Sequence, residues 1–212
     1  MKLFVVLLAV AGLAFASGTI SGRPGGECGF VIPETDDIID SYAFNQAEQM
    51  GTIGASFDDY ATIDDFDYAT TLNSYTCWAV TTGSTPTALE LLVVEDASGV
   101  PSGAPTSQTS YSVTPVNSGY TYGSYPIWIA EIVTTDNPTV DNVWLGSHRA
   151  DGVSWYPVGG LTVTGSEGYR TQAAGWSWEP FSGSLEAGDL FKIVDGTSSL
   201  SRSTWAGIKN MF

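Results

Sequence analysis

The sequence predicts an all-β protein, a two-sheet antiparallel β-sandwich that is jelly-roll-like and has about eight strands. Two observations lead to this fold class. From Thr52 onward, short runs rich in Val, Ile, Thr, Tyr and Trp alternate with clusters of Gly, Pro, Asn, Asp and Ser, which is typical of sandwiches and barrels. Before the C-terminal tail, no segment keeps a helical period over three turns.

Eight segments have the composition of strands, and turn residues bound each of them. They cover residues 63–69, 72–81, 88–95, 108–115, 125–134, 142–148, 160–164 and 189–194. Segment 88–95 is mostly apolar, so we expect a central strand that is covered on both faces. Pro126 lacks a backbone N–H and therefore places the first residues of its segment at a strand start or at a sheet edge. Residues 96–105 are expected to form a turn-rich loop.

The N-terminus has the layout of a secretory signal peptide over residues 1–16. Lys2 supplies the positive charge, residues 3–13 are apolar, and residues 14–16 form a small-x-small cleavage site. The apolar run is about eleven residues, against the roughly twenty that a membrane-spanning helix needs, and an uncleaved anchor is the alternative. We expect no membrane insertion after signal removal.

The remaining chain divides into three parts. Residues 17–51 form a leader that is mostly irregular, residues 52–196 form the β-sandwich domain, and residues 197–212 form a tail. Helical spacing in the tail puts Trp205, Ile208, Met211 and Phe212 on one face, so we expect a short C-terminal helix.

The distribution of charged residues disfavours some classes of binding partner. The formal net charge is -16, and no Lys or Arg lies between Pro24 and His148, a stretch that holds 17 of the 23 acidic residues. Phosphate backbones are bound by clustered basic residues, so nucleic acid and anionic lipid are poor partners. A divalent cation or a basic partner is one interpretation of this acidity, and a well-solvated secreted surface is the other.

Five segments, in this order, carry a resemblance to a known group of proteins. They are Ile63-Asp64-Asp65-Phe66, Tyr75-Thr76-Cys77-Trp78, the Gly/Pro loop 99–105, residues 142–147, and Gly188-Asp189-Leu190-Phe191-Lys192-Ile193. The order resembles secreted β-sandwich surface modules found in large extracellular proteins of environmental bacteria. The resemblance covers roughly residues 56–196, implies the fold and implies no activity. The tail is similar to the Trp-x-x-Ile-Lys tails of other exported bacterial proteins, which implies a sorting or anchoring signal, and a helix docked on a sheet edge is the alternative.

The two cysteines, Cys28 and Cys77, are expected to form a disulfide, because an isolated pair in an oxidising compartment usually bridges. The bridge would close a loop of about 50 residues and stabilise the fold by roughly 4 kcal/mol in the chain-entropy model. A buried thiol at Cys77 and a free one at Cys28 form the alternative. Two sulfurs and one histidine, His148, are too few for a Cys/His zinc site.

The sequence contains no pattern that predicts an enzyme. His148 is the one histidine and no Gly-x-Ser-x-Gly segment exists, so a Ser-His-Asp triad is not expected and His148 is interpreted as a surface or packing residue. Adjacent acids on a strand point to opposite faces and do not converge as a glycosidase pair would.

Calcium is the ionic ligand that the acidic run favours. Five carboxylates, those of Asp58, Asp59, Asp64, Asp65 and Asp67, lie within ten residues that contain no basic side chain. Carboxylate oxygens are the ligands that Ca²⁺ prefers, although the EF-hand glycine is missing. Solvated acids at strand ends are the alternative.

Aromatic side chains suggest a second kind of binding. Trp78, Trp128 and Trp144 lie in expected strands and are interpreted as core residues. Trp155, Tyr156, Trp176 and Trp178 lie in Gly-rich loops, where exposed rings would stack on sugars. Rings that pack beneath loops and cover the ends of the sandwich are the other interpretation, and it is the one we favour.

These observations favour a non-enzymatic extracellular or cell-surface β-sandwich with a structural or adhesive role. The alternative is a carbohydrate-binding module that uses the loop aromatics. The expected partners are polysaccharide, other surface proteins or further copies of the chain.

Overall fold

The computed structural model describes residues 38–42, 50–52, 60–161, 163, 165–166, 168–172, 175–181 and 188–198. Every regular element in these ranges is a β-strand. Within them, no helix is long and apolar enough to span a membrane. The predicted C-terminal helix lies outside the described residues, and residues 197 and 198, at the start of the predicted tail, belong to the last strand.

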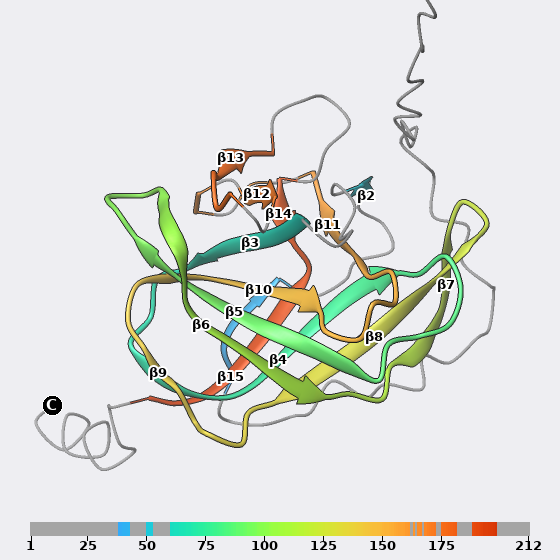
Figure 1. Cartoon of the computed structure of the whole chain (residues 1–212), viewed down its shortest axis with the longest axis horizontal. Coiled ribbons are helices and arrows are strands. Elements are labelled where there is room, and N and C mark those ends of the chain that lie inside the picture. Colours follow the sequence, from blue (N-terminus) through green and yellow to red (C-terminus); the bar gives the residue numbers. More distant parts are fainter. Residues whose placement is uncertain are drawn as a thin grey trace, which may run out of the picture.

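The strands form two antiparallel sheets, consistent with the predicted sandwich (Figure 1). The larger sheet has nine strands. They are β1 (Ile38–Tyr42), β2 (Met50–Thr52), β4 (Thr70–Val80), β7 (Val116–Tyr122), β8 (Tyr125–Val133), β9 (Thr139–Val140), β11 (Tyr156–Gly160), β14 (Asp189–Leu190) and β15 (Lys192–Ser198). In this sheet β4 pairs with β15 and β8, and β1 pairs with the outer side of β15.

The smaller sheet has six strands in the order β13-β12-β3-β10-β5-β6. Their bounds are β13 (Glu179–Pro180), β12 (Tyr169–Gln172), β3 (Tyr60–Phe66), β10 (Val143–Arg149), β5 (Ala88–Asp96) and β6 (Pro101–Ser112). Strand β5 lies between β10 and β6, so the prediction of an interior strand at 88–95 is confirmed.

The described residues contain more strands than the eight that were predicted, and two differences have a clear cause. Much of the loop predicted over 96–105 belongs to β6, which contains Pro101 and Pro105. Because β6 is an edge strand, a residue without a backbone N–H is tolerated there. Strands such as β13 and β14 have two residues each, which is too short for an alternating pattern to appear.

The leader predicted as mostly irregular contains β1 and β2. Strand β1 pairs with β15 over Ile38–Tyr42 and therefore belongs to the larger sheet. Tertiary pairing decides this outcome, because the acidic segment itself carries no strand pattern.

The main core lies between the two sheets. It combines Leu72 and Cys77 of the larger sheet with Phe66, Leu91 and Leu145 of the smaller one. Alternate residues on β4, such as Trp78, form a second cluster on the opposite face of the larger sheet. A third cluster, built around Trp144, lies on the outer face of the smaller sheet.

Candidate functional site

A lysine and an aspartate enter the sandwich from opposite sheets. On β3, Phe66 lies in the core between the sheets, and strand alternation places Asp64 on the same side. On β15, Val194 lies in that core and places Lys192 on the same side. Two oppositely charged side chains therefore meet between the sheets.

Lys192 is surrounded by carboxylates. Its Nζ lies 3.1 Å from Asp64 Oδ2, 3.5 Å from Asp40 Oδ2 and 3.8 Å from Asp65 Oδ1. It also donates a hydrogen bond to the backbone carbonyl of Asp65. These four residues, called the Lys192 cluster below, join β1 and β15 of the larger sheet to β3 of the smaller sheet.

The pair at the centre of the cluster is removed from water. Asp64 is 0 % exposed and Lys192 is 4 % exposed. The backbone N–H of Leu190 donates to Asp64 Oδ2 over 3.1 Å, and the backbone N–H of Asp65 donates to Asp64 Oδ1 over 3.1 Å. Both carboxyl oxygens of Asp64 thus have a backbone donor, as a buried polar group requires.

Burial and charge set the protonation of this pair. Burial raises the pKa of Asp64 to about 7, although the neighbouring Lys192 ammonium lowers it. Burial lowers the pKa of Lys192, but the carboxylates of Asp64, Asp40 and Asp65 outweigh that effect and raise it overall. Lys192 is therefore held as an ammonium, and Asp64 takes up a proton at a higher pH than an ordinary aspartate does.

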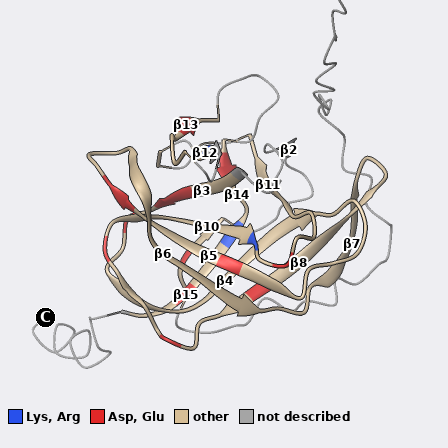
Figure 2. Cartoon of the chain, viewed as in Figure 1, with Lys and Arg blue, Asp and Glu red and all other residues tan. Residues whose placement is uncertain are grey.

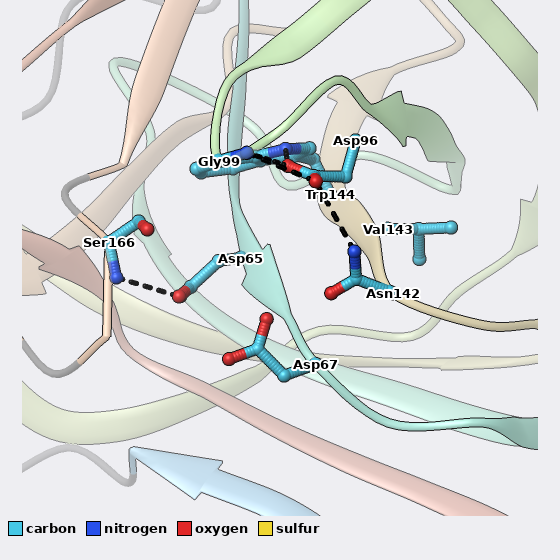
Figure 3. A pocket seen from close by; sticks show the side chains of 8 residues that line it. All are labelled: Asp65, Asp67, Asp96, Gly99, Asn142, Val143, Trp144 and Ser166. Atoms are coloured by element: carbon cyan, nitrogen blue, oxygen red, sulfur yellow. Dashed lines mark hydrogen bonds between the residues drawn. The ribbon is translucent and has the colours of Figure 1, made fainter.

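Two hollows adjoin the cluster and share Asp65 and Asp67. The larger has a volume of about 280 Å³, and its other lining residues are Asp40, Ser41, Tyr42, Asp64, Tyr68, Gly165, Asp189 and Lys192. The smaller has a volume of about 150 Å³, and its other lining residues are Asp96, Gly99, Asn142, Val143, Trp144 and Ser166 (Figure 3). Figure 2 shows that Asp and Glu positions outnumber Lys and Arg positions in the described chain.

Hydrogen bonds hold two of the three acids of the smaller hollow, Asp65 and Asp96, in place. Asp65 Oδ2 accepts the backbone N–H of Ser166 over 2.7 Å. Asp96 Oδ1 accepts the indole N–H of Trp144 over 3.0 Å, and Asp96 Oδ2 accepts the Asn142 amide over 3.2 Å (Figure 3). These carboxylates are thus engaged by protein donors.

The acidic run contains no basic side chain of its own, but the fold brings one to it. Lys192, 127 residues after Asp65, brings an ammonium to Asp64 and Asp65. Asp67 is exposed and lines both hollows, whereas Asp58 and Asp59 lie outside the described residues. In the described ranges, no group of three or more acidic, His or Cys side chains has a geometry suited to a metal ion.

The four loop aromatics do not form one platform. Trp155 is 0 % exposed, and its indole N–H donates to Ser147 Oγ over 3.2 Å. Tyr156 is also buried, on β11, so at these two positions the rings are covered and are not available to stack on a sugar. Both rings lie in clusters built from strand residues, which a sequence window across a Gly-rich segment does not show.

Trp176 and Trp178 remain partly exposed and adjacent. Their ring centroids are 5.8 Å apart with an interplanar angle of 36°. Both pack against the outer face of the smaller sheet, and the indole N–H of Trp178 donates to the Gly103 carbonyl over 2.8 Å. Of the predicted core tryptophans, Trp78 and Trp144 are buried and Trp128 is partly buried.

Cys77 and His148 both lie inside the fold. Cys77 is buried in the core, and burial raises the pKa of its thiol to about 12. Cys28 lies outside the described residues, so the disulfide remains a prediction. His148 is buried rather than on the surface, and its Nδ1 lies 2.8 Å from Glu90 Oε2.

Sequence reasoning missed the two residues that complete the cluster, Asp40 and Lys192. A usable signal existed for Lys192, which is the single charged residue in the apolar stretch from Leu190 to Val194. A lysine in such a stretch needs a buried partner. The sequence does not reveal which of the many acids is that partner.

The fold and the site together define an all-β protein of two packed antiparallel sheets with an ionic cluster between them. Comparison with known protein families, with characterised proteins and with solved structures finds no match to this chain.

Proposed function

We propose that the chain is a non-enzymatic structural or adhesive β-sandwich, of jelly-roll-like arrangement, that works outside the cytoplasm. The observation that carries the proposal is the Lys192 cluster, in which the reactive groups of the site bind one another across the two sheets. Although these side chains also line a hollow, their charges are paired with one another, and this pairing supports a role in holding the fold together.

Other candidate groups support the same interpretation. His148 is bound to Glu90, Trp155 is bound to Ser147, and Cys77 is a core thiol. These three side chains are thus used inside the fold. The acidic surface and the signal-like residues 1–16 favour a location outside the cytoplasm.

One experiment addresses the location. Residues 1–37 are fused to alkaline phosphatase, which is active only after export. We expect phosphatase activity from the fusion and none from its Leu8→Arg variant, which interrupts the apolar run. An inactive fusion would contradict an exported protein.

A second experiment addresses the role. The purified chain is tested for retention on polysaccharides and cell-wall material, for self-association, and for hydrolysis of the same polysaccharides. We expect retention or association without turnover. Turnover that disappears in the Asp65→Asn and Asp67→Asn variants would instead make the acidic hollows an active site.

Carbohydrate binding remains the second candidate because Trp176 and Trp178 are adjacent and partly exposed. Two rings form a smaller platform than the four that the sequence suggested, and their planes are not parallel. If this candidate is correct, Trp176→Ala should abolish retention on a glycan array. The matched control is Tyr68→Ala, which removes an exposed ring elsewhere.

A further inference from the structure

Lys192 has an environment that differs from that of an ordinary salt-bridged lysine. It is the one lysine in the described part of the chain, and it reaches from one sheet to a carboxyl group on the other. A hydrogen-bonded ion pair of this kind is costly to bury, because both charges lose their hydration. An uncharged link between the same two side chains would avoid that cost.

We propose that the amine of Lys192 and the carboxyl group of Asp64 condense to an intramolecular isopeptide bond that joins the two sheets covalently. This inference goes beyond the proposed role and holds whatever the chain binds. It assigns a covalent modification site to two residues that the sequence does not connect.

The first support is proximity. Lys192 Nζ lies 3.1 Å from Asp64 Oδ2, a direct contact that holds the amine nitrogen beside the carboxyl group whose Cγ it would attack. Both residues belong to strands of the sandwich, β15 and β3, so the sheets hold the pair together. Encounter of the two groups therefore costs little further entropy.

The second support is the polarisation of the Asp64 carboxyl group. Backbone N–H groups of Leu190 and Asp65 donate to its two oxygens, each over 3.1 Å. Such donors stabilise the negative charge that develops on oxygen when a nucleophile adds to the carboxyl carbon. Because burial raises the pKa of Asp64 to about 7, its neutral, electrophilic form is populated at neutral pH.

The condensation balances within the pair. The ammonium of Lys192 transfers one proton to the Asp64 carboxylate, which leaves an amine and a carboxylic acid. Nζ then forms a bond to Cγ, a proton passes from nitrogen to a carboxyl hydroxyl, and the Cγ–OH bond breaks. One amide and one water molecule result, without an oxidant or other reactant. The hollow beside the pair reaches exposed residues such as Asp67 and Tyr68, and gives the water a way out.

Geometry distinguishes Asp64 from the other acids of the cluster. Asp40 and Asp65 lie farther from Nζ, at 3.5 Å and 3.8 Å. Their side chains are 25 % and 13 % exposed, against 1 % for Asp64. Water stabilises the charged and less electrophilic form of a carboxyl group, so Asp64 is the favoured partner.

The first test measures the intact mass of the wild-type chain by mass spectrometry after the chain has been unfolded and reduced. We expect a mass lower by one water molecule than that calculated for the purified polypeptide, counted without the signal peptide if it has been removed. Dehydration at Asp151-Gly152 or Asp195-Gly196 would give the same loss, so a chymotryptic digest must contain a branched peptide that joins Asp64 to Lys192. Reductive methylation in denaturant should modify Lys209 and leave Lys192 unmodified.

Variants assign the bond to its atoms. Lys192→Arg keeps a positive charge without an amine nucleophile, and Asp64→Ala removes the electrophile, so both should have the full mass. The matched control, Asp40→Asn, removes a carboxylate from the same cluster and should keep the mass deficit. A wild-type chain of full mass with a methylated Lys192 overturns the proposal and leaves an ion pair. A branched peptide at Asp40 or Asp65 overturns the choice of Asp64.

Discussion

The tryptophan side chains of this protein have different roles, which depend on how deeply each is buried. The indole N–H of Trp144 donates to Asp96, that of Trp155 donates to Ser147, and that of Trp178 donates to Gly103. Trp155 makes its bond inside the core, whereas Trp178 makes its bond at the surface of the smaller sheet. The energetic consequence of removing a tryptophan should therefore differ between positions.

We expect Trp155→Ala to lower the free energy of unfolding by about 3 to 5 kcal/mol, because it leaves a cavity in the core. Trp176→Ala should lower it by only about 1 to 2 kcal/mol, because part of that ring is already in contact with water. Chemical denaturation followed by circular dichroism measures both. Equal losses would show that Trp176 also belongs to the core.

At the scale of elements, the approach of two strands depends on a glycine. Gly146 lies in β10, and a Cβ at this position would overlap the backbone carbonyl of Thr62 on β3. It would also lie 2.9 Å from Ile63 Cγ2. The absence of a side chain thus allows β3 to pack beside β10 in the sheet that carries Asp64.

We expect Gly146→Ala to destabilise the fold by roughly 1 to 3 kcal/mol, as overpacking of a core usually does. Gly83→Ala is the matched control, because a Cβ at Gly83 has no atom within 4 Å and its backbone has no positive φ. Thermal unfolding of the two variants makes the comparison. A Gly146→Ala variant as stable as the control would contradict the close approach.

The end of β5 is fixed by Asp96. Burial raises the pKa of this carboxyl group, but hydrogen bonds from Gly99, Trp144 and Asn142 outweigh burial and lower it from its ordinary value of 3.8. A folded-state pKa below the unfolded value means that the unfolded state binds more protons. The stabilisation is therefore complete above about pH 4 and is lost as the pH falls through the lowered pKa.

We expect Asp96→Asn to be less stable than wild type at neutral pH, with a difference that shrinks as the pH falls below the ordinary carboxyl range. Denaturation curves at a series of pH values measure this difference. If the difference in free energy of unfolding between the two proteins stayed constant as the pH fell, the carboxylate form of Asp96 would contribute nothing to stability.

At the scale of the whole molecule, the predicted disulfide would tie the N-terminal leader to the sandwich. Cys77 lies in the core between the sheets, and its Sγ is 3.8 Å from the Ala130 carbonyl oxygen. Buried thiols with a raised pKa are unreactive, because the thiolate is the nucleophile. Access to Cys77 therefore reports on the integrity of the core.

We expect no alkylation of Cys77 in the native protein. In denaturant without reductant, a Cys28–Cys77 disulfide would keep both cysteines unlabelled, and added reductant would release them. Intact mass after alkylation counts the labels. Labelling in denaturant alone would rule out the disulfide, and labelling of the native chain would contradict the burial of Cys77.

The strands that sequence predicted best are interior ones. Segments 72–81, 88–95, 125–134 and 142–148 correspond to β4, β5, β8 and β10, because apolar and β-branched runs carry a local signal. The predicted segment 63–69 is shifted toward the C-terminus relative to β3, which begins at Tyr60. The predicted segment 160–164 shares only Gly160 with β11. Edge strand β1 was missed, and only the C-terminal part of edge strand β6 falls within a predicted segment, 108–115, because edge strands depend on their neighbours.

The sequence by itself determined the fold class, the acidity and the expectation of export, because composition and periodicity are local properties. It also marked Asp64 and Asp65 as unusual. Only the tertiary structure decided that Lys192 meets Asp64 between the sheets, since their contact joins residues far apart in the chain. The same holds for Trp155 and Cys77, because burial depends on how two sheets pack, and no window of sequence contains both sheets.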